Sequence, residues 1–367
     1  MTYMDSLPSA SSLYEPILDT GYVPDMLLRA GVRSLLARRC ATLTHATAAA
    51  ADETKTAYIK LLKEREAIAI NTKEANEQHY ELPTEFFQLC LGSRLKYSSC
   101  LFDKEDVHTL DEAEVAMLDL YCVRAGVQDG MRILDLGCGW GSLTLYLAKR
   151  FPKSEIVGLS NSSSQREYIL DQAKTKGLVN VTIHTGDIAV FEMEDQFDRI
   201  FSIEMFEHMK NYQTLFAKVS KWLKPTLGRL FVHVFAHKTM PYDFKTDEDN
   251  SWMAKFFFTG GTMPSQDLFM WFQRDLEVVD RWTLNGKNYG KTSEEWLKRM
   301  DRNKSKIIPI FEKTYGNTEQ AYIWFHRWRI FYLSVAETFN YNNGEEWFVV
   351  NYLFQRKSPE SALELLP

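Results

Sequence analysis

The chain has 367 residues, of which 45% are hydrophobic and 25% are charged, and its formal net charge at pH 7 is −6. This composition is typical of a folded globular protein and excludes wholesale disorder, while the lack of a basic surplus argues against dedicated binding to nucleic acid or anionic membranes. No apolar run approaches the roughly 20 residues that span a bilayer, so stable membrane insertion is not expected.

The amino terminus and the cysteines favour a cytoplasmic location. The first residues carry neither the basic nor the apolar segment of a secretion signal. The five cysteines are scattered and show no CxxC spacing, which argues against a disulfide framework or a structural zinc site and indicates a reducing compartment. We therefore expect no bound metal.

The chain before residue 106 is predicted to be mainly helical. Residues 1–20 are rich in Ser and Pro, so a flexible amino terminus is expected. Residues 21–105 form a predicted helical extension and cap, because apolar residues recur at helical spacing up to about residue 75 and an aromatic, aperiodic stretch follows. A further amphipathic helix begins near Asp111, with acidic residues in its first turn as the helix dipole favours.

Residues 106–234 alternate strand and helix signals at short intervals. Five apolar strands separated by helices predict an α/β fold with a doubly wound, mostly parallel sheet. Residues 235–344 then predict a helical, aromatic-rich lid over the substrate. Residues 345–357 predict a last strand at an antiparallel edge of the sheet, and residues 358–367 a tail.

A glycine cluster follows the first strand, with Gly137, Gly139 and Gly141 at alternate positions after Asp135. Glycines let the backbone turn tightly and approach a ligand closely, although a plain strand-to-helix turn would need some of them too. The spacing is GxGxG rather than the GxGxxG of dinucleotide sites, which suits a ligand without a pyrophosphate. The DLGCGWG context resembles motif I of the Rossmann-like class I S-adenosylmethionine-dependent methyltransferases. This resemblance implies that Gly137 and Gly139 line the amino-acid end of S-adenosylmethionine and that Asp135 supports the loop.

The next two strand ends supply further candidate cofactor contacts. Many members of this class bind the ribose hydroxyls through an acidic residue after the second strand, and this chain has Ser160, Asn161 and Gln165 there instead. Helix capping by Ser160 is the structural alternative for that residue. After the third strand, Asp187 and Ile188 stand where the class places the adenine amino group and ring.

The fourth strand leads into a second candidate site, Glu204, Glu207 and His208. On a helical turn, the two carboxylates would share a face, although solvated loop charges and a core histidine are the structural alternative. Methyl transfer to an alkyl amine needs a free lone pair, and deprotonating an amine of pKa near 10 at pH 7 costs about 4 kcal/mol. A carboxylate that attracts the ammonium and a base that accepts its proton would meet that need.

Three segments together extend the resemblance to the plant coclaurine-type N-methyltransferases, relatives of the cyclopropane fatty-acid synthases: LDLGCGWGSLTLYLA, FSIEMFEHMKNY and YNNGEEW. The resemblance implies that Tyr97 and Ser98 contact the cofactor and that the carboxylates and His208 face the amine. The substrate residues that it implies or suggests are Tyr80, Glu204, Met205, Phe206, Trp328 and Phe331. For the aromatic pair on a helix, a core role is the alternative, and for His233 a core role is favoured over a site role.

We therefore predict an S-adenosylmethionine-dependent N-methyltransferase that acts on plant amines, either benzylisoquinolines or phenylalkylamines. Lipid cyclopropanation is the first alternative. Ser99 replaces the cysteine that helps hold bicarbonate in the lipid synthases, and Glu204 replaces their small residue, so both argue against it. A cofactor-binding but inactive relative is the second alternative. The expected partner is a small aromatic amine, with a homodimer left open.

Overall fold

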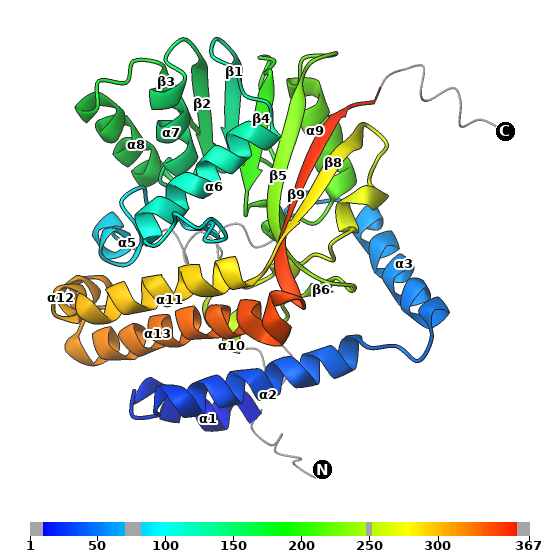
Figure 1. Ribbon diagram of the computed structural model, residues 1–367. Helices are drawn as coiled ribbons and strands as arrows, with labels where there is room; N and C mark the ends of the chain where they lie inside the picture. Colours follow the sequence, from blue (N-terminus) through cyan, green and yellow to red (C-terminus); the bar gives the residue numbers. More distant parts are fainter. Residues whose placement is uncertain (1–9, 70–81, 247–251, 358–367) are drawn as a thin grey trace, which may run out of the picture.

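The computed structural model describes residues 10–69, 82–246 and 252–357 of the chain. Its sheet occupies the upper half of Figure 1, with helices on both faces, and a layer of helices lies beneath the sheet. Among the described residues, no helix is long and apolar enough to cross a membrane.

The main sheet has seven strands in the order β3-β2-β1-β4-β5-β9-β8. Its first five strands are mutually parallel, which confirms the predicted α/β class. These strands are β1 (Arg132–Leu136), β2 (Glu155–Ser160), β3 (Val181–Thr185), β4 (Arg199–Ile203) and β5 (Arg229–His237).

The antiparallel end of the sheet differs from the prediction. The last strand, β9 (Trp347–Arg356), is antiparallel to β5 as expected. It is not the edge strand, because β8 (Leu276–Leu284) pairs with its other side. β8 is half-buried and lies inside the stretch predicted as a lid. Its buried and exposed positions alternate only weakly, so the sequence did not indicate a strand there.

Four helices flank the parallel strands: α6 (Leu110–Arg124), α7 (Ser142–Arg150), α8 (Ser163–Thr175) and α9 (Tyr212–Trp222). α6 begins with a capping box in which the Thr109 hydroxyl accepts from the Glu112 amide and the Glu112 carboxylate accepts from the Thr109 amide. The predicted acidic first turn, Asp111 and Glu112, is therefore confirmed as the start of this helix.

The lower layer is helical, as the sequence predicts for much of the second half of the chain (Figure 1). It contains α10 (Trp252–Phe256), α11 (Lys287–Arg302), α12 (Lys304–Tyr315) and α13 (Thr318–Asn340). A small antiparallel sheet of β6 (Tyr242–Asp243) and β7 (Thr262–Met263) follows β5 in the chain, and α10 lies between its two strands. Short 3-10 turns follow β4, β7 and α13, namely η1 (Phe206–His208), η2 (Leu268–Trp271) and η3 (Tyr341–Gly344).

The amino-terminal part consists of α1 (Ala10–Asp19), α2 (Asp25–Leu43), α3 (Ala48–Glu64) and α5 (Thr84–Cys90). The prediction that residues 1–20 lack order is wrong for the ten residues of α1. α2 has no fully buried residue, but partly buried apolar side chains of α1 and α2, such as Leu18, Leu28 and Val32, pack against the main core. Ion pairs also tie both helices to the lower layer. Arg29 bonds Glu294 and Glu337, and Arg327 bonds Asp19.

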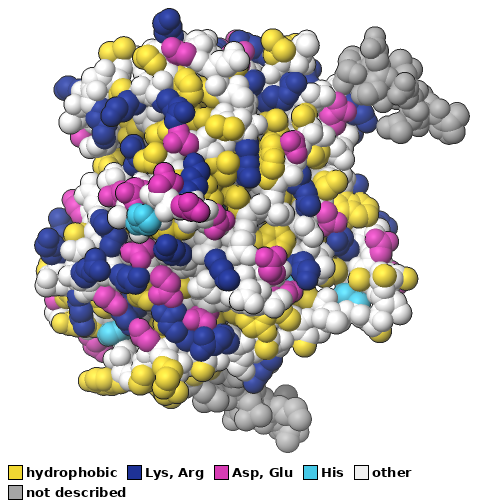
Figure 2. Space-filling view, in the orientation of Figure 1, with side chains coloured by type: hydrophobic (Ala, Val, Ile, Leu, Met, Phe, Trp, Pro, Cys, Tyr) yellow, Lys and Arg dark blue, Asp and Glu magenta, His cyan; other side chains and the backbone are white. Residues whose placement is uncertain are grey.

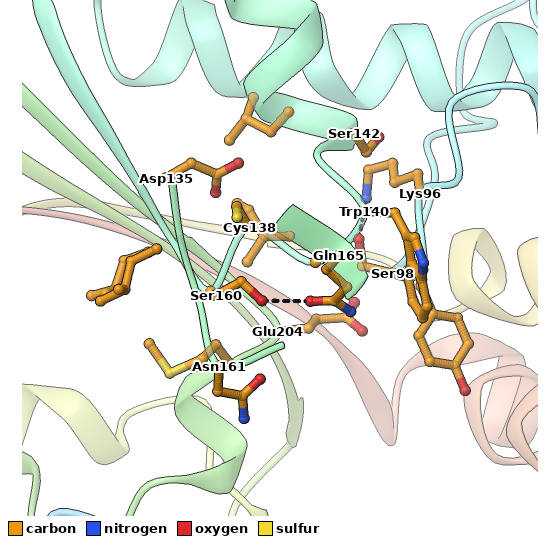
Figure 3. A pocket seen from close by; sticks show the side chains of 18 of the residues that line it. Lys96, Ser98, Asp135, Cys138, Trp140, Ser142, Ser160, Asn161, Gln165 and Glu204 are labelled. Carbon is orange, nitrogen blue, oxygen red and sulfur yellow. Dashed lines mark hydrogen bonds between the residues drawn. The ribbon is translucent and has the colours of Figure 1, made fainter. Parts of the chain in front are cut away.

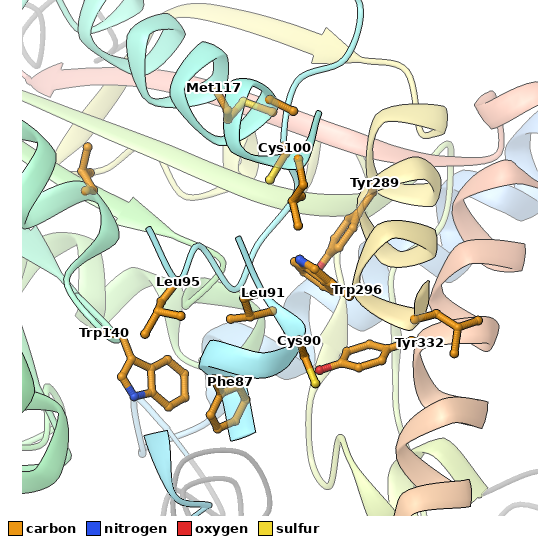
Figure 4. Close-up of a cluster of buried hydrophobic side chains, with 14 of the residues drawn as sticks. Phe87, Cys90, Leu91, Leu95, Cys100, Met117, Trp140, Tyr289, Trp296 and Tyr332 are labelled. Carbon is orange, nitrogen blue, oxygen red and sulfur yellow. The ribbon is translucent and has the colours of Figure 1, made fainter. Parts of the chain in front are cut away.

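Exposed apolar side chains remain on α1 and α2, such as Ile17, Met26 and Leu27. Figure 2 shows hydrophobic atoms gathered at the lower margin of the molecule, where these helices lie. The main hydrophobic core lies elsewhere, and it extends without a break from the sheet into the lower helical layer. In Figure 4, Tyr289 and Trp296 project from α11 toward the segment that carries Leu91, Leu95 and Cys100.

Candidate active site

Two cavities meet at the carboxyl ends of the parallel strands. The first cavity is narrow, about 160 Å³, and lies against the loops that follow β1 to β4. The second cavity, about 930 Å³, lies between the sheet and the helices of the lower layer and of α1 and α2. Among the described residues, three line both cavities: Tyr97, Glu204 and His208. A group that must pass from a molecule in one cavity to a molecule in the other would cross there.

Glu204 stands at this junction in an unusual backbone conformation. Its φ of +50° is in the left-handed region, which a residue with a side chain adopts only when its surroundings fix it. The sequence interpretation, in which Glu204 and Glu207 share a helical turn, is wrong on this point, since only Phe206–His208 form a 3-10 turn. The Glu204 amide donates to the His233 carbonyl at 2.8 Å, which ties the strand end to β5.

Three donors hold the Glu204 carboxylate. Oε1 accepts from the Ser99 amide at 2.9 Å and lies 3.1 Å from His233 Nε2. Oε2 accepts from the Tyr289 hydroxyl at 2.6 Å. An ionised carboxylate offers about two acceptor positions on each oxygen. Within the described contacts, Oε1 is therefore saturated, and Oε2 keeps one position for a further donor.

Glu207 lies behind this junction. Its side chain is fully buried and lines neither cavity, and Oε1 accepts from the Phe235 amide at 2.9 Å. Burial, followed by the nearby Glu204 charge, raises the Glu207 pKa well above its usual value. Burial therefore disfavours the ionised form of this carboxyl, which makes Glu207 a poor candidate for the group that accepts a proton. His208, by contrast, lines both cavities, with its ring centroid 4.8 Å from that of Phe258.

The glycine loop after β1, for which cofactor contacts are predicted, borders the first cavity. Gly137 and Gly139 have φ of +83° and +52°, conformations that strain other residues. A Cβ on Gly137 would come within 2.8 Å of Met205, whereas a Cβ on Gly139 would meet nothing within 4 Å. Gly139 therefore presents open space to the cavity. Asp135 accepts from the Thr144 hydroxyl at 2.7 Å, and burial raises its pKa to about 6.

Past β2 the first cavity contains a buried donor that no described protein group satisfies. Ser160 Oγ donates to Gln165 Oε1 at 2.7 Å, so the Gln165 amide nitrogen faces away from it (Figure 3). That nitrogen has no described hydrogen-bond partner. A buried donor without a partner is costly, which indicates that a bound group accepts from it. Asn161, Asp187 and Ile188 line the same cavity. These features fit a ligand that carries hydroxyl groups, as the ribose of S-adenosylmethionine does.

The segment before α6 closes the first cavity from the other side. Tyr97 and Ser98, for which cofactor contacts are predicted, both line it. The buried Lys96 ammonium donates to the Ser98 hydroxyl at 2.5 Å and to the Ser99 carbonyl at 2.7 Å. The Glu114 carboxylate accepts from the Arg94 and Lys96 amides, so α6 fixes the path of this segment.

The predicted substrate residues have different positions. Phe331 lines the second cavity, and its ring stacks on Phe257 at 4.5 Å. Met205 lines the first cavity only. Phe206 and Trp328 are fully buried and line neither cavity, so the structure assigns both to the core. Tyr80 lies outside the described residues.

Several residues of the junction escaped the sequence analysis. Tyr289 and the Ser99 amide reach Glu204 from distant segments, and no local motif marks either of them. His233 contacts Glu204 directly, although a core role was favoured for it. Phe235 and Phe258 add aromatic surface to the second cavity beside His208. The strand sequence FVHVF did contain a signal for His233, because this polar residue stands among apolar residues in a strand predicted to be buried.

Known proteins resemble this chain over most of its length. The profile of the mycolic acid cyclopropane synthetase family matches residues 69–336. (S)-Coclaurine N-methyltransferase of Thalictrum flavum subsp. glaucum is 42% identical over 93% of this chain and 94% of that protein. Pavine N-methyltransferase of the same plant is 42% identical over 76% of this chain and 78% of that protein. A crystal structure of coclaurine N-methyltransferase bound to N-methylheliamine and SAH has a TM-score of 0.89 at 42% identity, and the match covers 94% of this chain and 99% of that one.

A lipid enzyme is more distant. Cyclopropane-fatty-acyl-phospholipid synthase of Escherichia coli (strain K12) is 35% identical over 61% of this chain and 56% of that protein. The family profile begins at residue 69 and so leaves out α1 to α3, whereas the coclaurine enzyme matches 93% of the chain. A match of that extent must include at least part of the amino-terminal helices that border the second cavity.

Proposed function

The chain belongs to the mycolic acid cyclopropane synthetase family and is an S-adenosylmethionine-dependent N-methyltransferase, and we propose that its substrates are amines of the benzylisoquinoline or phenylalkylamine alkaloids. The observation that carries the proposal is the position of Glu204 and His208 where the two cavities meet. When bound in the first cavity, the cofactor supplies a methyl group activated on a sulfonium.

We assign cofactor binding to the loops that surround the first cavity. Gly139 gives the ligand room, and the Gln165 amide nitrogen donates to a hydroxyl oxygen. Tyr97 and Ser98 close the opposite side, where Tyr97 also borders the second cavity. The remaining assigned residues are Asp135, Gly137, Ser160, Asn161, Asp187 and Ile188, all of which line the first cavity.

The amine binds at Glu204 in this proposal. The open acceptor position on Oε2 takes an N–H of the substrate ammonium, and a charge-assisted hydrogen bond of this kind orients the nitrogen. His208, or the Glu204 carboxylate itself, then accepts the proton that the nitrogen must lose before it can attack. Glu207 is not assigned the role of base in this scheme, because burial beside Glu204 disfavours its ionised form. The apolar second cavity excludes water and receives the aromatic part of the amine, along Phe331 among others.

Lipid cyclopropanation is less well supported. A neutral alkene has no ammonium to meet the free acceptor position of Glu204 Oε2. The cytoplasmic location and the homodimer remain predictions. Sedimentation equilibrium of the purified chain measures its molar mass in solution and so tests the homodimer.

A mass-spectrometric assay tests the function. The purified chain is incubated with S-adenosylmethionine and a panel of phenylalkylamines, tetrahydroisoquinolines, phenols and an unsaturated phospholipid. We expect a gain of one methyl mass on nitrogen in amines alone, with tetrahydroisoquinolines or phenylalkylamines ranked first. Methylation or cyclopropanation of the phospholipid alone would refute the proposal. Glu204→Gln serves as the matched control, because it keeps the side-chain shape and removes the charge.

A further inference from the structure

His233 connects Glu204 to the interior of the sheet through both of its ring nitrogens. Nε2 lies 3.1 Å from Glu204 Oε1, and Nδ1 lies 3.1 Å from Asn351 Nδ2 and 3.0 Å from the Tyr121 hydroxyl. The contact with Asn351 follows from the fold, since the two residues are paired across β5 and β9. Both side chains are fully buried.

Arg124 determines which way the Asn351 amide faces. The Arg124 guanidinium lies 2.5 Å from Asn351 Oδ1, and its position over the Trp282 ring at 4.9 Å holds it there. A guanidinium has donors only, so the amide must turn its oxygen to Arg124. The Asn351 NH₂ group is thereby directed at His233 Nδ1.

The orientation of Asn351 fixes the tautomer of His233. Since a donor faces Nδ1, that nitrogen must carry the lone pair, and the single proton of a neutral imidazole is on Nε2. Burial is the main cause that lowers the His233 pKa to about 4, against the opposing effect of the Glu204 contact. At neutral pH the ring is therefore uncharged and donates from Nε2 to Glu204.

We call the chain of hydrogen bonds formed by Arg124, Asn351 and His233 the His233 relay. We propose that the His233 relay positions the Glu204 carboxylate through a neutral donor and so leaves its negative charge for the substrate ammonium. The inference rests on the proposed function in that it takes Glu204 as the amine-binding group. Arg124 and Asn351 are positioning residues, because they act on the amine only through His233 and Glu204.

Either other state of His233 would impair the site. A protonated ring would form an ion pair with Glu204 and compete with the ammonium for its charge. A neutral ring with its proton on Nδ1 would point a lone pair at Glu204 Oε1 and remove one of the two donors to that oxygen. Within the described ion pairs, Glu204 has no Lys or Arg partner, which is consistent with a charge kept for a ligand.

The first test is nitrogen NMR of the full chain labelled with ¹⁵N-histidine, recorded at pH 7 without substrate. The His233 signals are identified by their loss in His233→Gln. We expect a protonated Nε2 and an unprotonated Nδ1. A proton on Nδ1, or on both nitrogens, would overturn the proposal. This readout needs no amine, so its failure is distinguishable from a failure of the methylation assay.

The second test replaces the donor that faces Nδ1 by an acceptor. In Asn351→Asp a carboxylate accepts from Arg124 and from Nδ1, which favours a protonated His233 between two carboxylates. We expect the amine KM at pH 7 to rise at least tenfold, with the cofactor Kd unchanged, and the rise to shrink at higher pH. The charged groups that act on His233 are Glu204, Lys96 and Arg124. An unchanged amine KM in a folded variant would overturn the proposal.

A pair of variants at Arg124 keeps the test valid if Asn351→Asp does not fold. Arg124→Gln retains a donor toward Asn351, and Arg124→Leu removes it. We expect the wild-type His233 tautomer and amine KM to persist in Arg124→Gln and to be lost in Arg124→Leu. Equal amine KM values and equal NMR spectra for the two variants would refute the relay.

Discussion

Tyr289 donates a 2.6 Å hydrogen bond to Glu204 Oε2, although the two residues are 85 positions apart in the chain. The bond joins α11 of the lower helical layer to the end of β4. The Glu204 carboxylate is thus held jointly by the sheet and by the layer that borders the second cavity. In the proposed function, amine binding against that layer is therefore coupled to the position of Glu204.

Removal of the Tyr289 hydroxyl tests this coupling. Tyr289→Phe keeps the ring, which stacks on Phe339 at 4.4 Å, and deletes only the donor to Glu204. A hydrogen bond to a charged group is worth about 1.5–3 kcal/mol, so we expect kcat/KM for the amine to fall about tenfold or more. The cofactor Kd, measured by calorimetry, should stay within a factor of two. A loss of cofactor affinity as large as the loss of activity would contradict the assignment.

A pair of glycine variants tests the first cavity. Gly139 and Gly177 both have positive φ and open space at the Cβ position, but only Gly139 lines the cavity. A left-handed alanine costs about 1–2 kcal/mol, so Gly139→Ala and Gly177→Ala should lose similar stability in urea unfolding. We expect only Gly139→Ala to weaken cofactor binding, by at least tenfold. Equal cofactor affinity in the two variants would disprove the placement of the cofactor.

Glu114 predicts a pH dependence of stability. Burial is the main cause that raises its pKa from 4.5 to about 7, so the folded chain binds a proton that the unfolded chain releases between these values. This contribution to stability is therefore complete near pH 4.5 and is lost as the pH rises toward 7. Glu114→Gln does not titrate. We expect the difference in unfolding free energy between variant and wild type to shift by about 3 kcal/mol in favour of the variant from pH 4.5 to pH 8. A pH-independent difference would contradict a raised pKa.

The ion pairs of α2 predict an effect on amine binding. Arg29 bonds Glu294 and Glu337 with a side chain that is 23% exposed. Among the described ion pairs, Arg33 bonds Glu337 alone, and its side chain is 54% exposed. Because α2 borders the second cavity, Arg29→Met should raise the amine KM several-fold, equivalent to about 1 kcal/mol. Arg33→Met is the matched control with a smaller effect. If Arg29→Met altered cofactor binding and left the amine KM unchanged, α2 would not belong to the amine site.

Much of the cofactor-binding part was predictable from the sequence, for physical reasons. Strand and helix periods alternate regularly there, and the carboxyl ends of parallel strands share one edge of the sheet, which brings Gly139, Gln165 and Glu204 to the same place. The helical lower layer followed from long periodic segments.

The failures of sequence reasoning arose where distant segments decide the outcome. β8 becomes a strand because β9 offers it an edge, and its half-buried residues show little alternation. Two aromatic residues three apart on a helix can each lie in the core or line a cavity, and the sequence does not distinguish these positions. Packing places Trp328 in the core and Phe331 at the second cavity. No local pattern could reveal that Tyr289 and Ser99 converge on Glu204.

The most direct test of the account is the steady-state kinetics of Glu204→Gln with the best amine of the panel, together with its cofactor Kd. In the proposed function, Glu204 binds the substrate ammonium, and other residues bind the cofactor. We expect kcat/KM for the amine to fall by about 10²–10⁴-fold, with the cofactor Kd unchanged. Activity within threefold of wild type, at the same cofactor Kd, would show that the amine does not bind at Glu204.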